Sequence, residues 1–148
     1  MSKALNCALR LLSRREHSAE ELITKLQQKG FPADEAVTAL AECQRLGYQS
    51  DERFAQSLCR SRINQGYGPL KINQELQARH LDKELIQDVL AQQKEKWAEH
   101  ARGVWQKKFK SSTKIDYPEM QKQQRFLAYR GFSMDIISTL FREINSEY

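Results

Sequence analysis

Three stretches of this chain carry the same pattern of residues, spaced by 50 and then by 51 positions. Apolar positions match apolar positions, and charged positions match charged ones. The matched triplets are Leu26, Leu76 and Leu127; Lys29, Arg79 and Arg130; Phe31, Leu81 and Phe132; Asp34, Glu84 and Asp135; Ala36, Ile86 and Ile137; and Leu40, Leu90 and Phe141. A register kept across both classes of residue predicts tandem structural repeats. A compact bundle with chance periodicity is the alternative.

Local signals predict that each repeat is helical. Glycine and proline number only six and three in 148 residues, and alternating strand-like runs are absent. Ser18 with Glu21 has the spacing of a capping box, and Asp51 is a second candidate N-cap. Gly30 and Gly47 are the predicted ends of the second and third helices. The residues predicted to face inward on the first and third helices are Leu5, Ala8, Leu9, Leu12, Ala36, Val37, Leu40 and Ala41.

The pattern as a whole predicts an all-α fold of three tandem three-helix modules in an elongated, curved helical array. The predicted modules are residues 3–47, 48–92 and 93–146, and the third is broken over residues 111–116. Arrays of this kind offer long faces to a partner in place of one deep pocket.

Composition indicates in which compartment the protein is expected and which class of partner it binds. The net charge of +5 favours an anionic partner. Three separated cysteines with no Cys-x-x-Cys pair argue against a disulfide framework or a zinc site and favour a reducing compartment. No apolar run of about 18 residues is present to span a bilayer. A cytoplasmic protein is therefore expected, with no membrane partner.

Basic residues gather in windows that hold no Asp or Glu. The first window runs from Arg53 to Lys71, the second from Arg102 to Lys114, and the third from Lys122 to Arg130. Residues 94–148 contribute +4 to the net charge, whereas residues 1–50 contribute +1 and residues 51–93 contribute 0. Such windows can neutralise phosphates without reading bases. The alternative for any single window is a solvated face that maintains solubility.

No constellation of catalytic residues is visible. His17, His80 and His100 lie far apart, show no metal-ligand spacing, and are expected at the surface or at helix ends. The Gly66-Tyr67-Gly68 segment lacks the rest of a phosphate-binding loop, so a plain turn is expected. No metal, no cofactor and no enzymatic activity are predicted. Trp97 and Trp105 are expected in the core. The tyrosines at 48, 67 and 129 are candidates for base stacking or for packing at helix ends.

Three separated motifs, in order, resemble the RecX family of regulatory proteins. Arg15-Glu16-His17-Ser18 with Lys29-Gly30-Phe31 is similar to the family's opening signature. Leu46-Gly47-Tyr48 through Phe54-Ala55, followed by Gly66-Tyr67-Gly68-Pro69, is similar to its most diagnostic stretch. Gln124-Arg125-Phe126-Leu127 with Tyr129-Arg130-Gly131-Phe132 is similar to its carboxyl-terminal pattern. Departures are mild: Gln49-Ser50 replaces a pair that is often acidic, and His80 replaces a common glycine.

This resemblance implies a modulator, mainly an inhibitor, of the RecA recombinase. The implied partners are the RecA filament and single-stranded DNA, with double-stranded DNA as a further candidate, in homologous recombination, DNA repair and the SOS response. A monomer is expected. The candidate contact residues, chosen by charge, are Arg53, Arg60, Arg62, Lys71, Arg79, Lys107, Lys108, Lys122, Arg125 and Arg130. The alternatives are a sequence-nonspecific DNA-binding helical protein without a recombinase partner, and a nuclease, for which no metal-binding cluster is visible.

Overall fold

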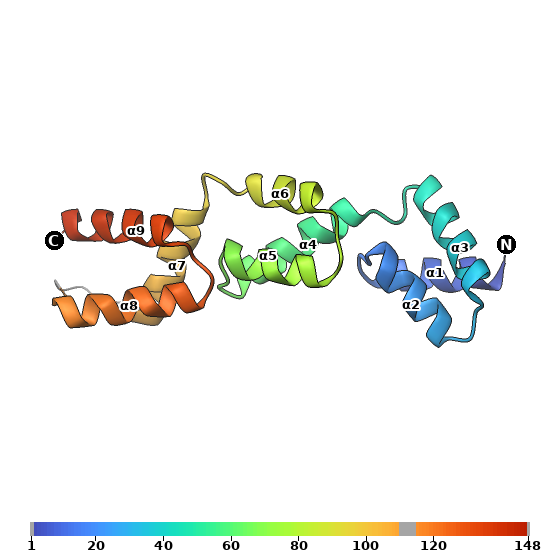
Figure 1. Ribbon diagram of the computed structural model, residues 1–148, viewed down its shortest axis with the longest axis horizontal. Helices are drawn as coiled ribbons and strands as arrows, with labels where there is room; N and C mark the ends of the chain where they lie inside the picture. Colours follow the sequence, from blue (N-terminus) through green and yellow to red (C-terminus); the bar gives the residue numbers. More distant parts are fainter. Residues whose placement is uncertain (1, 110–114, 148) are drawn as a thin grey trace.

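The computed structural model describes residues 2–109 and 115–147, and over these the chain forms helices and no strands. The predicted break at 111–116 lies largely outside them, as do Lys110 and Lys114 of the second basic window. The helices are α1 (Lys3–Arg14), α2 (Ala19–Gln28), α3 (Ala33–Arg45), α4 (Asp51–Asn64), α5 (Pro69–Ala78), α6 (Lys83–Ala91), α7 (Trp97–Phe109), α8 (Tyr117–Tyr129) and α9 (Met134–Glu147). They form three successive groups along the longest axis, with the two termini at opposite ends (Figure 1). The all-α prediction of tandem modules is confirmed.

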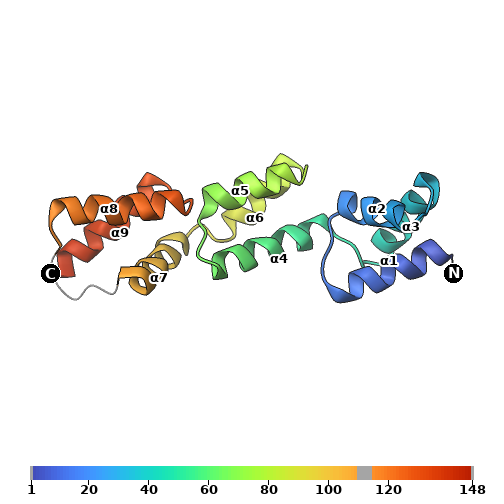
Figure 2. The same cartoon turned by 90° about the horizontal axis from the view of Figure 1, so that it is seen from below.

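We call these groups module 1 (α1–α3), module 2 (α4–α6) and module 3 (α7–α9). The connections between them run through residues 46–50 and 92–96. We propose module boundaries at 3–47, 48–92 and 93–146, which fall within these connections. Seen from below, α2, α5 and α8 lie in a row along one side of the molecule (Figure 2).

The apolar positions that match between the repeats lie in the core of each module. Leu26, Leu76 and Leu127 occupy the same place in the second helices, and all three are fully buried. The third helices repeat this with Ala36, Ile86 and Ile137, each at most 1% exposed. Charged members of the repeat such as Asp34 lie at the exposed starts of the third helices.

The first helices follow a shorter spacing that the sequence analysis missed. Ala8, Ala55 and Ala101 are separated by 47 and then 46 residues, and all three are fully buried. Leu11, Leu58 and Val104 keep the same spacing and are each half-buried against their cores. The difference between the two spacings arises inside the modules, between the first and second helices: Leu26 follows Ala8 by 18 residues, Leu76 follows Ala55 by 21, and Leu127 follows Ala101 by 26.

Some local predictions hold and others are wrong. Ser18 accepts a hydrogen bond from the Glu21 N–H at 3.1 Å, which confirms this N-cap. The α4 cap is Ser50, whose Oγ accepts from the Arg53 N–H at 3.2 Å, so the assignment of Asp51 was wrong by one residue. On α3, Val37 and Ala41 are exposed. The buried face of that helix includes Ala39 and Cys43 in their place.

The substitution of His80 for a common glycine leaves the helix end intact. α5 ends at Ala78, and His80 has φ of 59°, in the left-handed region that Gly30 and Gly131 occupy in the other modules. A non-glycine residue in this conformation carries a modest steric cost. The fold therefore imposes the helix end in spite of the local residue.

Within residues 2–109 and 115–147, the buried apolar residues form two clusters. One contains module 1 alone, from Ala4 to Cys43. The other contains modules 2 and 3 together, from Phe54 to Ile144. Modules 2 and 3 therefore share one hydrophobic core, whereas module 1 has its own.

Backbone contacts join modules 2 and 3. The Gly68 N–H donates to the Arg130 carbonyl at 2.8 Å, and the Leu70 N–H donates to the Gly131 carbonyl at 2.9 Å. This approach leaves no room for side chains, because a Cβ on Gly68 would lie 2.6 Å from the Gly131 carbonyl carbon and oxygen. Gly68 has φ of −97°, so space rather than backbone conformation requires glycine at this position.

Polar groups join modules 1 and 2. The Asp51 carboxylate accepts from the Ala19 N–H at 2.8 Å and from the Gln49 side-chain amide at 3.1 Å. The same amide donates to the His17 carbonyl at 3.1 Å. Gln49 is only 4% exposed, so this junction rests on buried hydrogen bonds.

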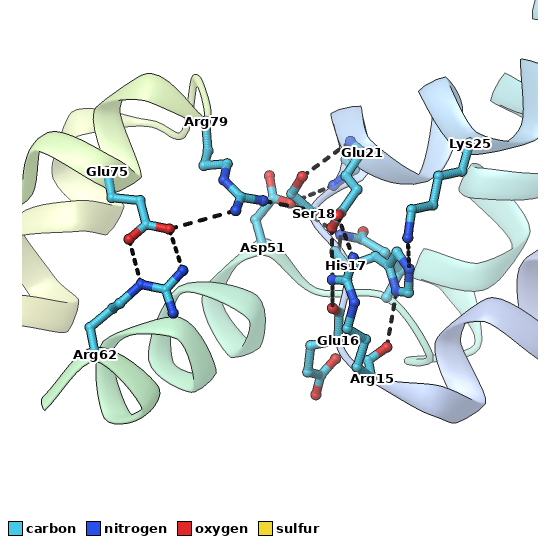
Figure 3. Close-up of polar contacts among 12 residues, drawn as sticks. Arg15, Glu16, His17, Ser18, Glu21, Lys25, Asp51, Arg62, Glu75 and Arg79 are labelled. Atoms are coloured by element: carbon cyan, nitrogen blue, oxygen red, sulfur yellow. Dashed lines mark hydrogen bonds and ion pairs between the residues drawn. The ribbon is translucent and has the colours of Figure 1, made fainter. Parts of the chain in front are cut away.

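His17 lies at a helix end, directly before the Ser18 N-cap of α2, but it is not at the surface, because it is only 1% exposed. Its Nδ1 lies 3.0 Å from the Arg15 carbonyl, and its Nε2 lies 3.2 Å from the Lys25 ammonium (Figure 3). A neutral imidazole that donates from Nδ1 and accepts at Nε2 satisfies both contacts. Burial also lowers the pKa of His17 from its ordinary value of 6.5.

The module 2–module 3 contact predicts opposite effects for two glycines. Gly68→Ala should lower the free energy of unfolding by about 2 kcal/mol, because the added methyl group forces the backbones apart. Gly103→Ala, inside α7 where an added Cβ meets nothing within 4 Å, should raise it by about 0.5–1 kcal/mol. Urea denaturation of both variants checks this. Equal effects of the two substitutions would contradict the docking described here.

The buried neutral His17 predicts that stability decreases in mild acid. The unfolded chain binds a proton as the pH falls through about 6.5, while folded His17 does not until its lower pKa is reached. The contribution of neutral His17 to the free energy of unfolding is therefore fully present above pH 6.5 and decreases below it. The measurement is urea denaturation at several pH values between 7.5 and 5.

His17→Gln should flatten this dependence. Burial lowers the pKa of His100 as well, so His100→Gln should remove a separate share of it. The hydrogen bond from Arg62 lowers the pKa of Glu75 from 4.5, so that carboxylate does not titrate in this window. An unchanged pH profile in the His17→Gln variant would reject the neutral buried state.

Candidate binding surfaces

The arginines predicted as contacts in module 2 are largely engaged within the molecule. Arg62 donates to both oxygens of Glu75, at 2.6 and 2.7 Å. Arg79 lies 3.6 Å from Glu75 and 3.9 Å from Glu21 of module 1. Arg15 pairs with Glu21 at 2.6 Å. Together these residues form an alternating chain of charges across the junction between modules 1 and 2 (Figure 3).

Arg53 is engaged at the same junction. It donates to the Glu16 carboxylate at 3.0 Å and to the Gly47 carbonyl at 2.9 Å. Arg53 and Arg79 therefore help to hold modules 1 and 2 together, whereas Arg62 pairs with Glu75 inside module 2. The charge of all three arginines is balanced by carboxylates.

Lys71 and Arg130 lie at the junction between modules 2 and 3, among aromatic rings. The Lys71 ammonium is 4.5 Å from the centre of the Tyr129 ring and 5.4 Å from that of Tyr67. Arg130 donates to the Gln65 carbonyl at 3.2 Å and lies 5.6 Å from the Tyr67 ring centre. Tyr129 is 76% exposed, so its ring face is accessible for stacking.

The other five candidates are exposed, and no ion pair between the described residues involves them. They are Arg60, Lys107, Lys108, Lys122 and Arg125. Lys107 and Lys108, together with Arg130, line a groove of about 640 Å³ at the junction between modules 2 and 3. Lys122 and Arg125 border a shallow depression at the start of α8, where Asp116 and Glu119 are also present.

The structure also reveals cations that the charge windows missed. Lys3, Arg10, Arg14 and Lys29 line one groove on module 1. Acidic residues separate some of them in the sequence, and the module's net charge is small. The positions 3, 10 and 14 nevertheless share one helical face, since they are spaced by seven and then four residues. A helical projection of the sequence could have found most of this set.

Nothing in the described chain resembles a metal centre. No group of three or more His, Cys, Asp or Glu side chains lies close enough together there to hold a metal ion. The three cysteines are free and buried, and burial raises the pKa of the Cys59 thiol to about 11, which disfavours the reactive thiolate. Over the same residues, no helix is both long and apolar enough to cross a membrane.

Comparison with known proteins gives a consistent assignment. Family models of the first, second and third three-helix domains of RecX match residues 4–43, 50–90 and 94–141. The chain is 57% identical over 148 residues to the regulatory protein RecX of Legionella pneumophila (strain Corby), covering 100% of this chain and 99% of that protein. It is 42% identical over 133 residues to the regulatory protein RecX of Pseudomonas fluorescens, covering 90% and 86% of the two chains.

A solved structure agrees. The crystal structure of RecX from Lactobacillus salivarius superposes with a TM-score of 0.83 at 25% identity, covering 97% of this chain and 95% of that one. Three modules, their repeated cores and the similarity along the full length thus lead to one conclusion: the chain belongs to the RecX family of regulatory proteins.

Proposed function

We propose that this protein binds the RecA filament on single-stranded DNA and mainly inhibits its recombinase and ATPase activities during DNA repair and the SOS response. Membership of the RecX family supports this proposal. The observation that carries it furthest is the distribution of the exposed cations: Lys107, Lys108, Lys122 and Arg125 all lie in module 3, in the elongated row of modules. A nucleoprotein filament is a long anionic surface, and an elongated basic surface complements it.

The proposal includes no chemical step by this protein. It acts as a cytoplasmic monomer, without cofactor, by occupying filament surface and interfering with extension or with the ATPase cycle. Arg60, Lys107, Lys108, Lys122 and Arg125 provide the contacts to phosphate or acidic protein surface. Lys71 and Arg130, beside the accessible ring of Tyr129, provide a further contact region.

A sequence-nonspecific DNA-binding protein without a recombinase partner is the second candidate. The exposed Tyr129 ring beside the Lys71 ammonium is the observation that favours it, because single strands bind to such pairs of aromatic and basic side chains. The two functions differ in whether the recombinase is needed.

The ATPase activity of preformed RecA filaments on single-stranded DNA tests the proposal. We expect the full chain to reduce hydrolysis at concentrations well below that of RecA. Replacing Lys107, Lys108, Lys122 and Arg125 together by Gln should weaken this inhibition at least about tenfold, since four unpaired charges are removed. Unaltered hydrolysis, together with tight binding to naked DNA, would favour the second candidate.

Single substitutions identify which cations touch phosphate. If Lys122 or Arg125 does, its replacement by Gln should reduce the slope of log affinity against log salt concentration by about one unit. Lys83→Gln on α6 is the matched control and should leave the slope unchanged. Fluorescence anisotropy with an oligothymidylate at several salt concentrations provides the measurement. An unchanged slope for both variants removes these residues from the DNA contact.

A further inference from the structure

The groove on module 1 has basic walls and an apolar floor. Its volume is about 540 Å³, and it runs along α1 to the residues that follow α2. The apolar residues that line it are Cys7, Leu11 and Phe31, and no residue of the described lining is acidic. Its four cations are exposed, and none of them takes part in an ion pair between the residues that the structure describes: Lys3, Arg10, Arg14 and Lys29.

The same groove exists in module 3, where it receives part of module 2. The repeat spacings match Asn6, Cys7, Arg10, Leu11, Arg14 and Lys29 with Glu99, His100, Gly103, Val104, Lys107 and Arg130. All six matched residues line the groove between modules 2 and 3, and its opposite wall is the end of α4 with the following turn, Ile63 to Gly66. There Ile63 packs against the shared core, and Arg130 donates to the Gln65 carbonyl.

In module 2 the matching surface also contacts the preceding module, module 1, and these contacts are between charged groups. Arg53, which matches Asn6, pairs with Glu16 of module 1 at 3.0 Å. Arg79, which matches Lys29, lies 3.9 Å from Glu21 of module 1. Twice in this chain, therefore, this surface binds the turn that precedes or follows a helix of the neighbouring module. In one of the two cases its arginines bind carboxylates.

Module 1 presents the same surface with more positive charge, and the groove is lined by module 1 alone. We propose that it is a docking site for a helix end of a partner protein that carries carboxylates and one apolar side chain. The apolar side chain covers Leu11 and Phe31, as Ile63 covers its part of the module 3 groove, and the carboxylates pair with Arg10 and Lys29. A nucleic-acid backbone fits less well, since it has no apolar group to place on this floor.

This inference goes beyond the proposed function, because none of these cations is among the candidate contacts with RecA and DNA. It concerns the opposite end of the molecule from the exposed cations of module 3 (Figure 1). A partner held there would be bound at the same time as the surface of module 3.

Binding of a defined peptide tests the site. The probe is a fluorescein-labelled helical peptide of Glu, Ala and Leu, and the reference ligand is an oligothymidylate of equal charge. The full chain should bind the peptide, and the double variant R10E/K29E should bind it at least about tenfold more weakly at moderate salt concentration. Its affinity for the oligothymidylate should change less than about threefold.

The control is the double variant K83E/R142E, which changes the net charge equally on exposed positions of α6 and α9. It should bind the peptide within about twofold of the original chain. Circular dichroism confirms folding, and R10Q/K29Q provides a milder second variant that should show an intermediate loss. Equal losses in R10E/K29E and K83E/R142E would reject the site. A loss of oligothymidylate binding alone would show that the groove holds nucleic acid and would also overturn the proposal.

Discussion

The end of one second helix lies against the start of another, and the arrangement of the whole molecule depends on this contact. The residues after α5, Arg79 and His80, approach the start of α2, and Arg130 and Gly131 after α8 approach the start of α5. The partial positive charge at one helix start faces the partial negative charge at the next helix end, which is favourable. A three-helix unit buries only a small core, so such neighbour contacts determine both stability and shape.

The two junctions are built from different interactions. Modules 2 and 3 are joined by backbone hydrogen bonds, glycine-to-backbone packing and a shared apolar cluster. Modules 1 and 2 are joined by ion pairs and by buried hydrogen bonds around Gln49, with separate cores on either side. Because salt screens partly exposed ion pairs, the junction between modules 1 and 2 responds more strongly to ionic conditions than the junction between modules 2 and 3. Modules 2 and 3 therefore behave as one unit to which module 1 is attached.

The distribution of charge along the sequence identified only part of the candidate binding surface. A window without acids suggested that Arg53 and Arg62 were free, yet each pairs with a carboxylate from outside that window. Arg79, a candidate chosen by charge, also has carboxylate neighbours. The windows were more successful in module 3, where Lys107, Lys108, Lys122 and Arg125 are exposed. They missed the groove on module 1, because Lys29 is brought beside the cations of α1 only by folding and because the acidic residues after α1 keep the net charge of residues 1–50 at +1.

The sequence by itself determined the helices, the threefold repeat and most of the positions that the second and third helices bury. These follow from signals that act over a few residues, such as the Ser18 cap, or that recur at fixed spacing, such as Leu26, Leu76 and Leu127. Only the tertiary structure decided that His17 is buried, that Gly68 meets the backbone of the next module, and which arginines hold the junctions together. Each of these depends on contacts between residues distant in the chain, and periodicity within a helix carries no information about which module, charge or backbone segment will lie opposite.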